Sequence, residues 1–172
     1  KVILPKYNDE TFEKYSKKNS ENSNSSAPAY GRKAVIYSTC FVNFNKKNTG
    51  IAALKVLKKN GVTVQHSYVG CCGMPYLEQA DLKKVVNQAQ KVSKELLTWI
   101  DKGYEIITLT ASCGLMLKFE WPLLLPKDPN IKKLSKHTKD IDEYIMDIHQ
   151  KEGLVSGIKE IQGGVTVHHA CH

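Results

Sequence analysis

β-rich runs alternate with amphipathic helical stretches along most of the chain, and this order constrains the fold more than any other feature of the sequence. The runs typical of strands cover residues 33–40, 62–70, 104–110 and 164–171, and helical periodicity covers residues 48–61, 81–102 and 131–151. Strands joined through helices over connections this short pair in parallel through right-handed crossovers. The sequence therefore predicts a three-layer α/β fold: a mainly parallel sheet with crossover helices on its faces.

All five cysteines follow the predicted strands at their carboxyl ends. Cys40 closes the first run, Cys71 and Cys72 follow the second, Cys113 follows the third, and Cys171 closes the fourth. The carboxyl ends of parallel strands meet at one edge of a sheet, where α/β proteins bind ligands. Because cysteines that only fill a core would also occur inside strands and helices, we expect these thiols to converge on a site.

Four thiolates at one edge are suited to an iron–sulfur cluster or to a tetrahedral zinc ion. The adjacent pair Cys71 and Cys72 favours a polynuclear cluster, since neighbouring sulfurs can bind different metal atoms, and Gly73 allows a tight turn beside them. Two other interpretations stay open at this point. The thiols could be free and buried, or Cys113 could be a reactive thiol activated by the amino end of a helix.

Composition narrows the class of protein further. An odd number of cysteines, five, argues against a disulfide framework and for a reducing compartment, so we expect a cytoplasmic protein. The net charge is +8, but the lysines are scattered and Arg32 is the single arginine, so we expect a solvated basic surface and no nucleic-acid site. No apolar run approaches the roughly 20 residues that cross a bilayer.

The chain divides into three parts by composition. Residues 1–32 are polar and rich in serine and asparagine, and we expect a linker or tail there. Residues 33–163 form the globular unit, and residues 164–172 contain a further strand. His168, His169 and His172 surround Cys171 and could form a second metal site with it, whereas His66 is expected to be partly buried and hydrogen-bonded.

Four segments carry a resemblance to a known family: "CFVNFNKKNTG", "NGVTVQHSYVGCCGMP", "SCGLMLKFEWP" and "VTVHHACH". They resemble the CCG, or cysteine-rich, domain of iron–sulfur subunits such as those of heterodisulfide reductase and of anaerobic glycerol-3-phosphate dehydrogenase. The resemblance is strongest to the second of these.

The resemblance implies an electron-transfer subunit that passes electrons from a flavin dehydrogenase, with glycerol 3-phosphate as one candidate substrate, to a quinone or another acceptor. Cys40, Cys71, Cys72 and Cys113 would bind a 4Fe–4S cluster in a first CCG repeat, residues 33–163, and Cys171 would open a second repeat. The implied partners are a flavoprotein dehydrogenase and a ferredoxin-like iron–sulfur domain. Sites for a non-cubane cluster in this family have a five-cysteine pattern, with a CxxC after the adjacent pair. Position 116 is Met where that pattern has its last Cys, so a four-cysteine cubane or zinc is favoured.

Three alternatives remain beside the electron carrier, which would not itself be catalytic. The thiolates could hold a structural zinc ion, or the chain could be a metal-free interaction module. It could also be a thiol/disulfide redox subunit like that of heterodisulfide reductase. Membrane association, on the cytoplasmic side, is expected only through an intact complex.

Overall fold

The computed structural model describes residues 4–19, 22–157 and 162–167. The elements in chain order are α1 (Phe12–Lys18), β1 (Lys33–Tyr37), α2 (Cys40–Phe44), α3 (Lys47–Lys59), β2 (Thr63–Ser67), α4 (Met74–Glu78), α5 (Leu82–Ile100), β3 (Glu105–Thr108), α6 (Ala111–Leu115), the π-helical turn η1 (Met116–Glu120), α7 (Trp121–Leu124), α8 (Pro129–Lys136), β4 (Thr138–Asp140) and α9 (Ile141–Lys151).

The four strands form one parallel sheet in the order β2-β1-β3-β4. Val35 on β1 lies beside Ile106 on β3 and beside Gln65 on β2, so β1 is a central strand. Strands β2 and β4 are the two edges of this sheet. The predicted α/β fold with a parallel sheet is confirmed.

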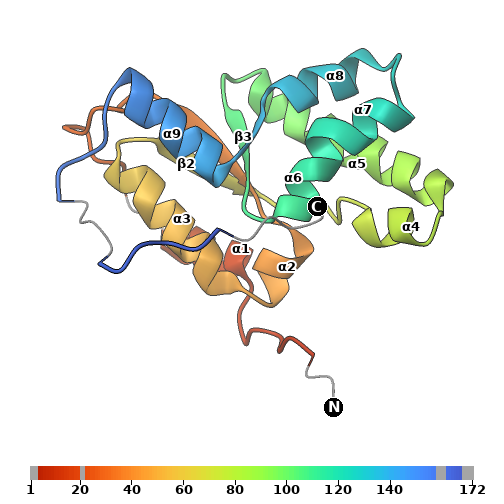
Figure 1. Cartoon of the computed structure of the whole chain (residues 1–172), viewed down its shortest axis with the longest axis horizontal. Coiled ribbons are helices and arrows are strands. Elements are labelled where there is room, and N and C mark those ends of the chain that lie inside the picture. Colours follow the sequence, from red (N-terminus) through yellow and green to blue (C-terminus); the bar gives the residue numbers. More distant parts are fainter. Residues whose placement is uncertain (1–3, 20–21, 158–161, 168–172) are drawn as a thin grey trace.

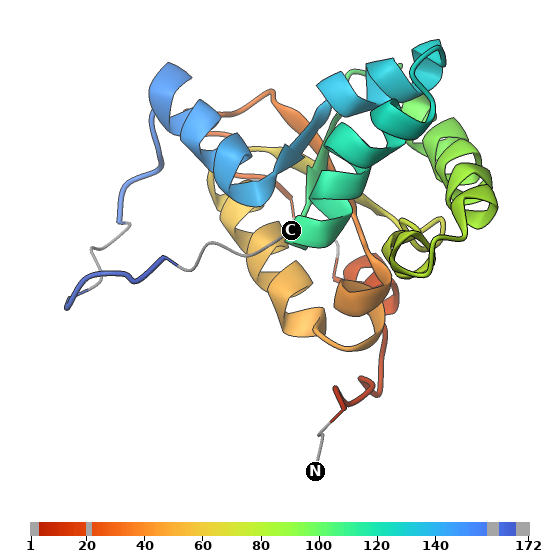
Figure 2. The same ribbon diagram turned by 45° about the vertical axis from the view of Figure 1, so that its right-hand side comes forward.

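Helices cover both faces of the sheet (Figure 1). On one face, Ala34 and Ile36 pack with α3 and α9; on the other, Val35 and Tyr37 pack with α5, α7 and α8. Figure 2 shows the same two helical layers with the strands between them. Alternate side chains of β1 thus enter two different cores, which explains why this central strand reads as a continuous apolar run.

Helix α5 shows how local sequence fixes an element. Asp81 caps its amino end by accepting a hydrogen bond from the Lys84 N–H, and the chain leaves through Gly103 at a φ of +83°. Buried apolar side chains recur three or four positions apart along it: Val85, Ala89, Val92, Leu96 and Ile100. This spacing places one stripe against the sheet.

The amino-terminal segment differs from the polar tail expected over residues 1–32. Its described part contains α1, whose Phe12 is fully buried in the core with α3. A Cβ on Gly50 would lie 2.6 Å from the Phe12 ring, so that glycine makes the room. Although the segment is polar on average, one aromatic side chain and the small residues Ala27 and Ala29 tie it to the globular unit.

The carboxyl-terminal half differs in two places. The single helix expected over residues 131–151 is two helices, α8 and α9, and β4 between them is the fourth strand of the sheet. The other expected strand, residues 164–171, is not formed in its described part: Val165 and Val167 are exposed and lie in no strand. Cys171, His168, His169 and His172 lie outside the described residues.

Among the residues with described positions, no helix combines the length and apolar character of a membrane-spanning segment.

Candidate metal centre

Cys40 is the first residue of α2, three positions after β1 ends. Thr39 caps that helix by accepting a hydrogen bond from the Val42 N–H, and its hydroxyl lies 3.2 Å from the hydroxyl of Thr110. Thr110 immediately precedes α6, the helix that carries Cys113. This contact between the two loops brings the ends of β1 and β3 together.

Cys71 and Cys72 lie in the loop between β2 and α4. Gly73, the next residue, has a φ of +91°, a left-handed conformation that side chains disfavour. A Cβ there would lie 3.6 Å from the Cα of Val85, so conformation rather than crowding is the reason for glycine. The turn reverses the chain directly after the two thiols and starts α4.

Cys113 lies in α6, which continues through the π-helical turn η1 into α7. The Trp121 N–H bonds to the carbonyl oxygen of Met116, five residues earlier, which is the widened spacing of a π-helix. Trp121 is fully buried and donates its indole N–H to the carbonyl oxygen of Cys72 over 3.1 Å. The helix carrying one cysteine is therefore hydrogen-bonded to the loop carrying two others.

The four thiols meet in one group. The Sγ of Cys72 lies 3.3 Å from the Sγ of Cys113, and Cys71 interacts electrostatically with the thiols of both Cys40 and Cys72. Cys72 and Cys113 are buried, whereas Cys40 and Cys71 are half-buried, and all four are free cysteines. Thiols that follow three different strands therefore lie together, whereas Cys171, the fifth cysteine, lies outside the described residues.

Hydrogen bonds within the group separate the acidities of the thiols. The thiol of Cys40 donates to Cys71, which raises the pKa of Cys40 and lowers the pKa of Cys71. Hydrogen bonds to Cys113 and Cys71, together with burial, raise the pKa of Cys72. Of Cys40, Cys71 and Cys72, Cys71 is the one most stabilised as a thiolate.

Backbone N–H groups favour negative charge on three of the sulfurs. The N–H of Gly73 donates to the Sγ of Cys71 over 3.4 Å. The N–H groups of Phe41 and Met74 lower the pKa of Cys40 and of Cys72, against the larger effects that raise both values. Such bonds stabilise negative charge on sulfur, and they tune metal–thiolate centres.

Tyr37, at the end of β1, lies under the group. Its hydroxyl donates to the carbonyl oxygen of Gly70 over 2.7 Å. Burial raises the pKa of Tyr37, and all four cysteines add to this effect. The tyrosine therefore stays neutral and holds the loop that leads to the adjacent pair.

The donor set fits a soft metal, since all four atoms are sulfur. Across residues 4–19, 22–157 and 162–167, no group of three or more His, Cys, Asp or Glu side chains has the geometry of a preformed metal site. The 3.3 Å between the sulfurs of Cys72 and Cys113 is direct thiol contact. In a tetrahedral site with metal–sulfur distances of about 2.3 Å the sulfurs lie about 3.8 Å apart, so the thiols would have to separate to bind a metal.

Several sequence expectations can be placed on this geometry. His66 is partly buried and hydrogen-bonded to Ser16 over 2.9 Å, as expected. Met116, at the position where the five-cysteine pattern has a cysteine, is fully buried. Sequence reasoning missed the roles of Tyr37 and Trp121, because both side chains bond to the loop of Cys71 and Cys72, which is 33 or more residues away from them in the sequence.

Comparison with known proteins gives consistent matches. Residues 34–118 match the cysteine-rich domain family, CCG. Lactate utilization protein A of Bacillus pumilus is 29% identical over 146 residues, covering 81% of this chain and 58% of that protein. A subunit of the anaerobic glycerol-3-phosphate dehydrogenase of Escherichia coli is 27% identical over 171 residues, covering 98% of this chain and 41% of that protein. An uncharacterized iron–sulfur protein of Methanocaldococcus jannaschii is 27% identical over 142 residues, covering 81% of this chain and 25% of that protein.

The chain thus spans only part of these relatives: 58% of the length of the Bacillus pumilus protein and 41% of the length of the Escherichia coli subunit. No solved structure matches it. The matched region begins inside β1 and runs into η1, so it contains all four converging cysteines. The part of the chain that supplies the four thiols, residues 34–118, is thus the part that matches the family of cysteine-rich CCG domains.

Proposed function

We propose that Cys40, Cys71, Cys72 and Cys113 bind an iron–sulfur cluster, of the 4Fe–4S type, and that the chain is an electron-transfer subunit without catalytic residues of its own. The observation that carries this proposal is the convergence of four free thiols from the ends of three strands. A cluster held there would accept and release single electrons.

The surroundings of the thiols support this role. The backbone N–H groups at the sulfurs stabilise thiolate charge, and burial of Cys72 and Cys113 keeps water away from two of the four ligands. Both factors help to set the reduction potential of an iron–sulfur centre. Cys40 and Cys71 are half-buried, so one side of the group stays near the surface, where a redox partner can approach.

The names of the relatives suggest the partners. One relative is part of a glycerol-3-phosphate dehydrogenase and another is named an iron–sulfur protein. We propose a flavoprotein dehydrogenase as electron donor, a quinone or another carrier as acceptor, and a ferredoxin-like iron–sulfur domain beside this one. The site of action would be the cytoplasm or the cytoplasmic side of a membrane complex.

Metal analysis of the full chain tests the proposal. The protein is purified without oxygen, and iron, sulfide and zinc are measured per chain, with a visible spectrum before and after dithionite. We expect about four irons and a broad absorbance that dithionite bleaches reversibly. Serine substitution at Cys72 or Cys113 should remove most of the iron, whereas Cys171→Ser, outside the four, should retain it.

The other outcomes are distinct. About one zinc and no iron would replace the electron carrier by a structural zinc site. A metal-free chain that also fails to take up a cluster from iron and sulfide would overturn metal binding altogether. Iron that cannot be reduced and reoxidised would overturn electron transfer.

The contact between Cys72 and Cys113 also favours a second candidate, a thiol/disulfide redox subunit. Two thiols 3.3 Å apart can transfer their two hydrogens to a disulfide reagent and become a disulfide with little movement. Thiol titration before and after exposure to oxidised glutathione tests it: a loss of two thiols that Cys113→Ser prevents would support it, and no loss would reject it.

A further inference from the structure

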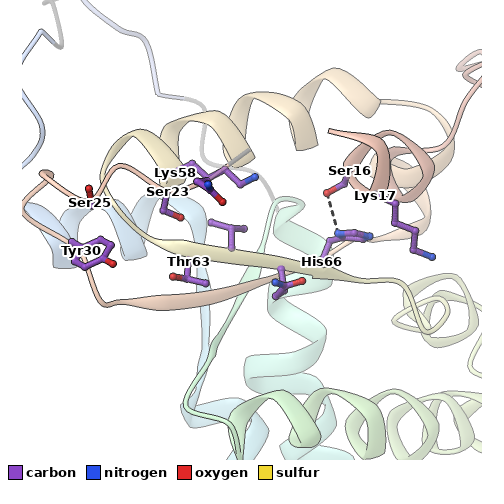
Figure 3. Close-up of a pocket in the computed structure, with 11 residues that line it drawn as sticks. Ser16, Lys17, Ser23, Ser25, Tyr30, Lys58, Thr63 and His66 are labelled. Atoms are coloured by element: carbon purple, nitrogen blue, oxygen red, sulfur yellow. Dashed lines mark hydrogen bonds between the residues drawn. The ribbon is translucent and has the colours of Figure 1, made fainter. Parts of the chain in front are cut away.

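A groove with a volume of about 670 Å³ lies beside the outer edge of β2 (Figure 3), and no cysteine is among the residues that line it. Figure 3 shows Ser23 and Tyr30 toward one end of the strand and Ser16, Lys17 and His66 toward the other. Residues 63–66 of β2 line the groove throughout. Nothing in the proposed electron-transfer role uses this part of the molecule.

The backbone N–H and C=O groups of β2 point alternately to the two sides of the strand. Thr63 donates its N–H to the carbonyl oxygen of Arg32, and Ser67 accepts from the N–H of Ser38, so positions 63, 65 and 67 face β1. Because backbone direction alternates along a strand, Val64 and His66 direct their N–H and C=O groups away from the sheet, toward the outer edge.

These outward groups have no partner within the described part of the chain. Val62, the preceding outward position, is already satisfied: its N–H bonds to Leu57 and its carbonyl accepts the hydroxyl of Ser23 over 2.6 Å. The open stretch is therefore confined to the part of β2 that lines the groove. An open strand edge is a template for one more strand.

The charged side chains that line the groove favour an added strand of opposite charge. Its lining includes Lys17 and Lys58 and contains no acidic residue among those the structure describes. Neither lysine is unpaired: Lys58 has an interaction of its own, and Lys17 pairs with Glu13 over 2.9 Å in an exposed contact. An acidic ligand can share a lysine that is paired in this way. A second copy of this chain paired through the same edge would bring like charges together, which disfavours it.

We propose that the open edge of β2 binds an extended peptide segment with acidic side chains, which adds to the sheet as a fifth strand. Backbone hydrogen bonds to Val64 and His66 would give the register, and Lys17 and Lys58 would favour acidic side chains. The hydrogen bond between Ser16 and His66 holds the wall of the groove in place without occupying the backbone of the strand.

The experiment uses the full chain and two synthetic eight-residue peptides, one alternating valine with glutamate and one alternating valine with lysine. We expect the acidic peptide to bind at least tenfold more tightly and to slow hydrogen exchange at the Val64 and His66 amides. Val64→Pro removes one outward N–H and leaves the bonds to β1, so it should weaken binding about tenfold.

Two charge-reversing substitutions on α3 give a matched comparison, which does not depend on whether the proline variant folds. Lys58→Glu should weaken binding of the acidic peptide several-fold, whereas Lys59→Glu, an exposed neighbour outside the groove, should not. Equal binding of both peptides, or no protection at Val64 and His66, would overturn the proposal. A concentration-dependent dimer that Val64→Pro abolishes would assign the edge to a second copy and overturn the peptide as occupant.

Discussion

The indole N–H of Trp121 bonds to the carbonyl oxygen of Cys72 over 3.1 Å, and both groups are buried. The two residues lie in different segments that supply thiols. Cys72 is in the loop after β2, and Trp121 follows the helical stretch that contains Cys113. One hydrogen bond therefore fixes the separation between a loop and a helix that both supply sulfurs.

Trp121→Phe should destabilise the fold by about 1–3 kcal/mol, because it leaves a buried carbonyl without a donor. Chemical denaturation measures the change. Trp99→Phe is the matched control, since the buried indole N–H of Trp99 has no partner among the described residues and its loss should cost less. Equal effects of the two substitutions would show that the bond to Cys72 adds nothing beyond ring packing.

Gly114→Ala should destabilise the protein by about 1–3 kcal/mol through overpacking. An added Cβ would overlap the carboxylate of Asp140 and lie 2.9 Å from the hydroxyl of Thr108, which donates to Asp140 over 2.6 Å. Thermal unfolding checks this. Ser112→Ala, in the same short helix, should be nearly neutral, and an equally neutral Gly114→Ala would contradict the packing described for α6 against β4.

Phe12→Ala should cost about 3–5 kcal/mol, the usual loss for a buried aromatic side chain. The ring is fully buried against α3, although it belongs to a segment of polar composition. Urea denaturation compares it with Lys14→Ala, an exposed change on the same helix. If the two variants unfolded at the same urea concentration, α1 would be a detachable tail.

Arg32→Gln should destabilise the fold at neutral pH, and the difference from the unsubstituted chain should shrink in acid. Arg32 bonds to Asp147 over 2.6 Å and to Glu152 over 2.8 Å, which joins the start of β1 to α9. Hydrogen bonds from Lys151 and Arg32 lower the pKa of Asp147. A carboxylate with a lowered pKa adds stability above its unfolded pKa of about 3.9 and loses it as pH falls.

Denaturation of both forms at several values of pH between 7 and 2 measures this effect. The gap between them should be largest near pH 7 and should close below about pH 4. A gap that persists unchanged at pH 2 would assign the effect of Arg32 to its packing over the ring of Tyr144 instead of to the ion pairs.

Sequence periodicity was sufficient for helices α3 and α5 and for the edge at which the cysteines meet. Helix α5 has a complete apolar stripe and a capping residue, so its bounds follow from local chemistry. Strand β4 was missed because three residues are too few for an alternating pattern and Thr138 and Asp140 are polar. Its place in the sheet depends on pairing with β3, which is a tertiary contact.

The same distinction applies to the site. The positions of the thiols after strands β1, β2 and β3 were visible in the sequence, since parallel strands end at one edge. The distances between the thiols could not be predicted, because they depend on contacts between segments distant in the sequence, such as Thr39 with Thr110 and Trp121 with Cys72. For the same reason the burial of Phe12 required the structure: it depends on the absence of a side chain at Gly50.

The π-helical turn η1 makes the spacing between Cys113 and Trp121 a matter of residue count as well as residue type. Each residue turns an α-helix by about 100°, so a segment that accommodates one extra residue directs the positions after it toward a different side of the axis. Deleting a single residue from Met116–Glu120 would let the turn relax to a regular α-helix and would rotate the indole away from the carbonyl of Cys72. The length of this stretch is therefore under a constraint that substitutions alone would not reveal, and natural variation in the domain should tolerate changes of side chain there more readily than insertions or deletions.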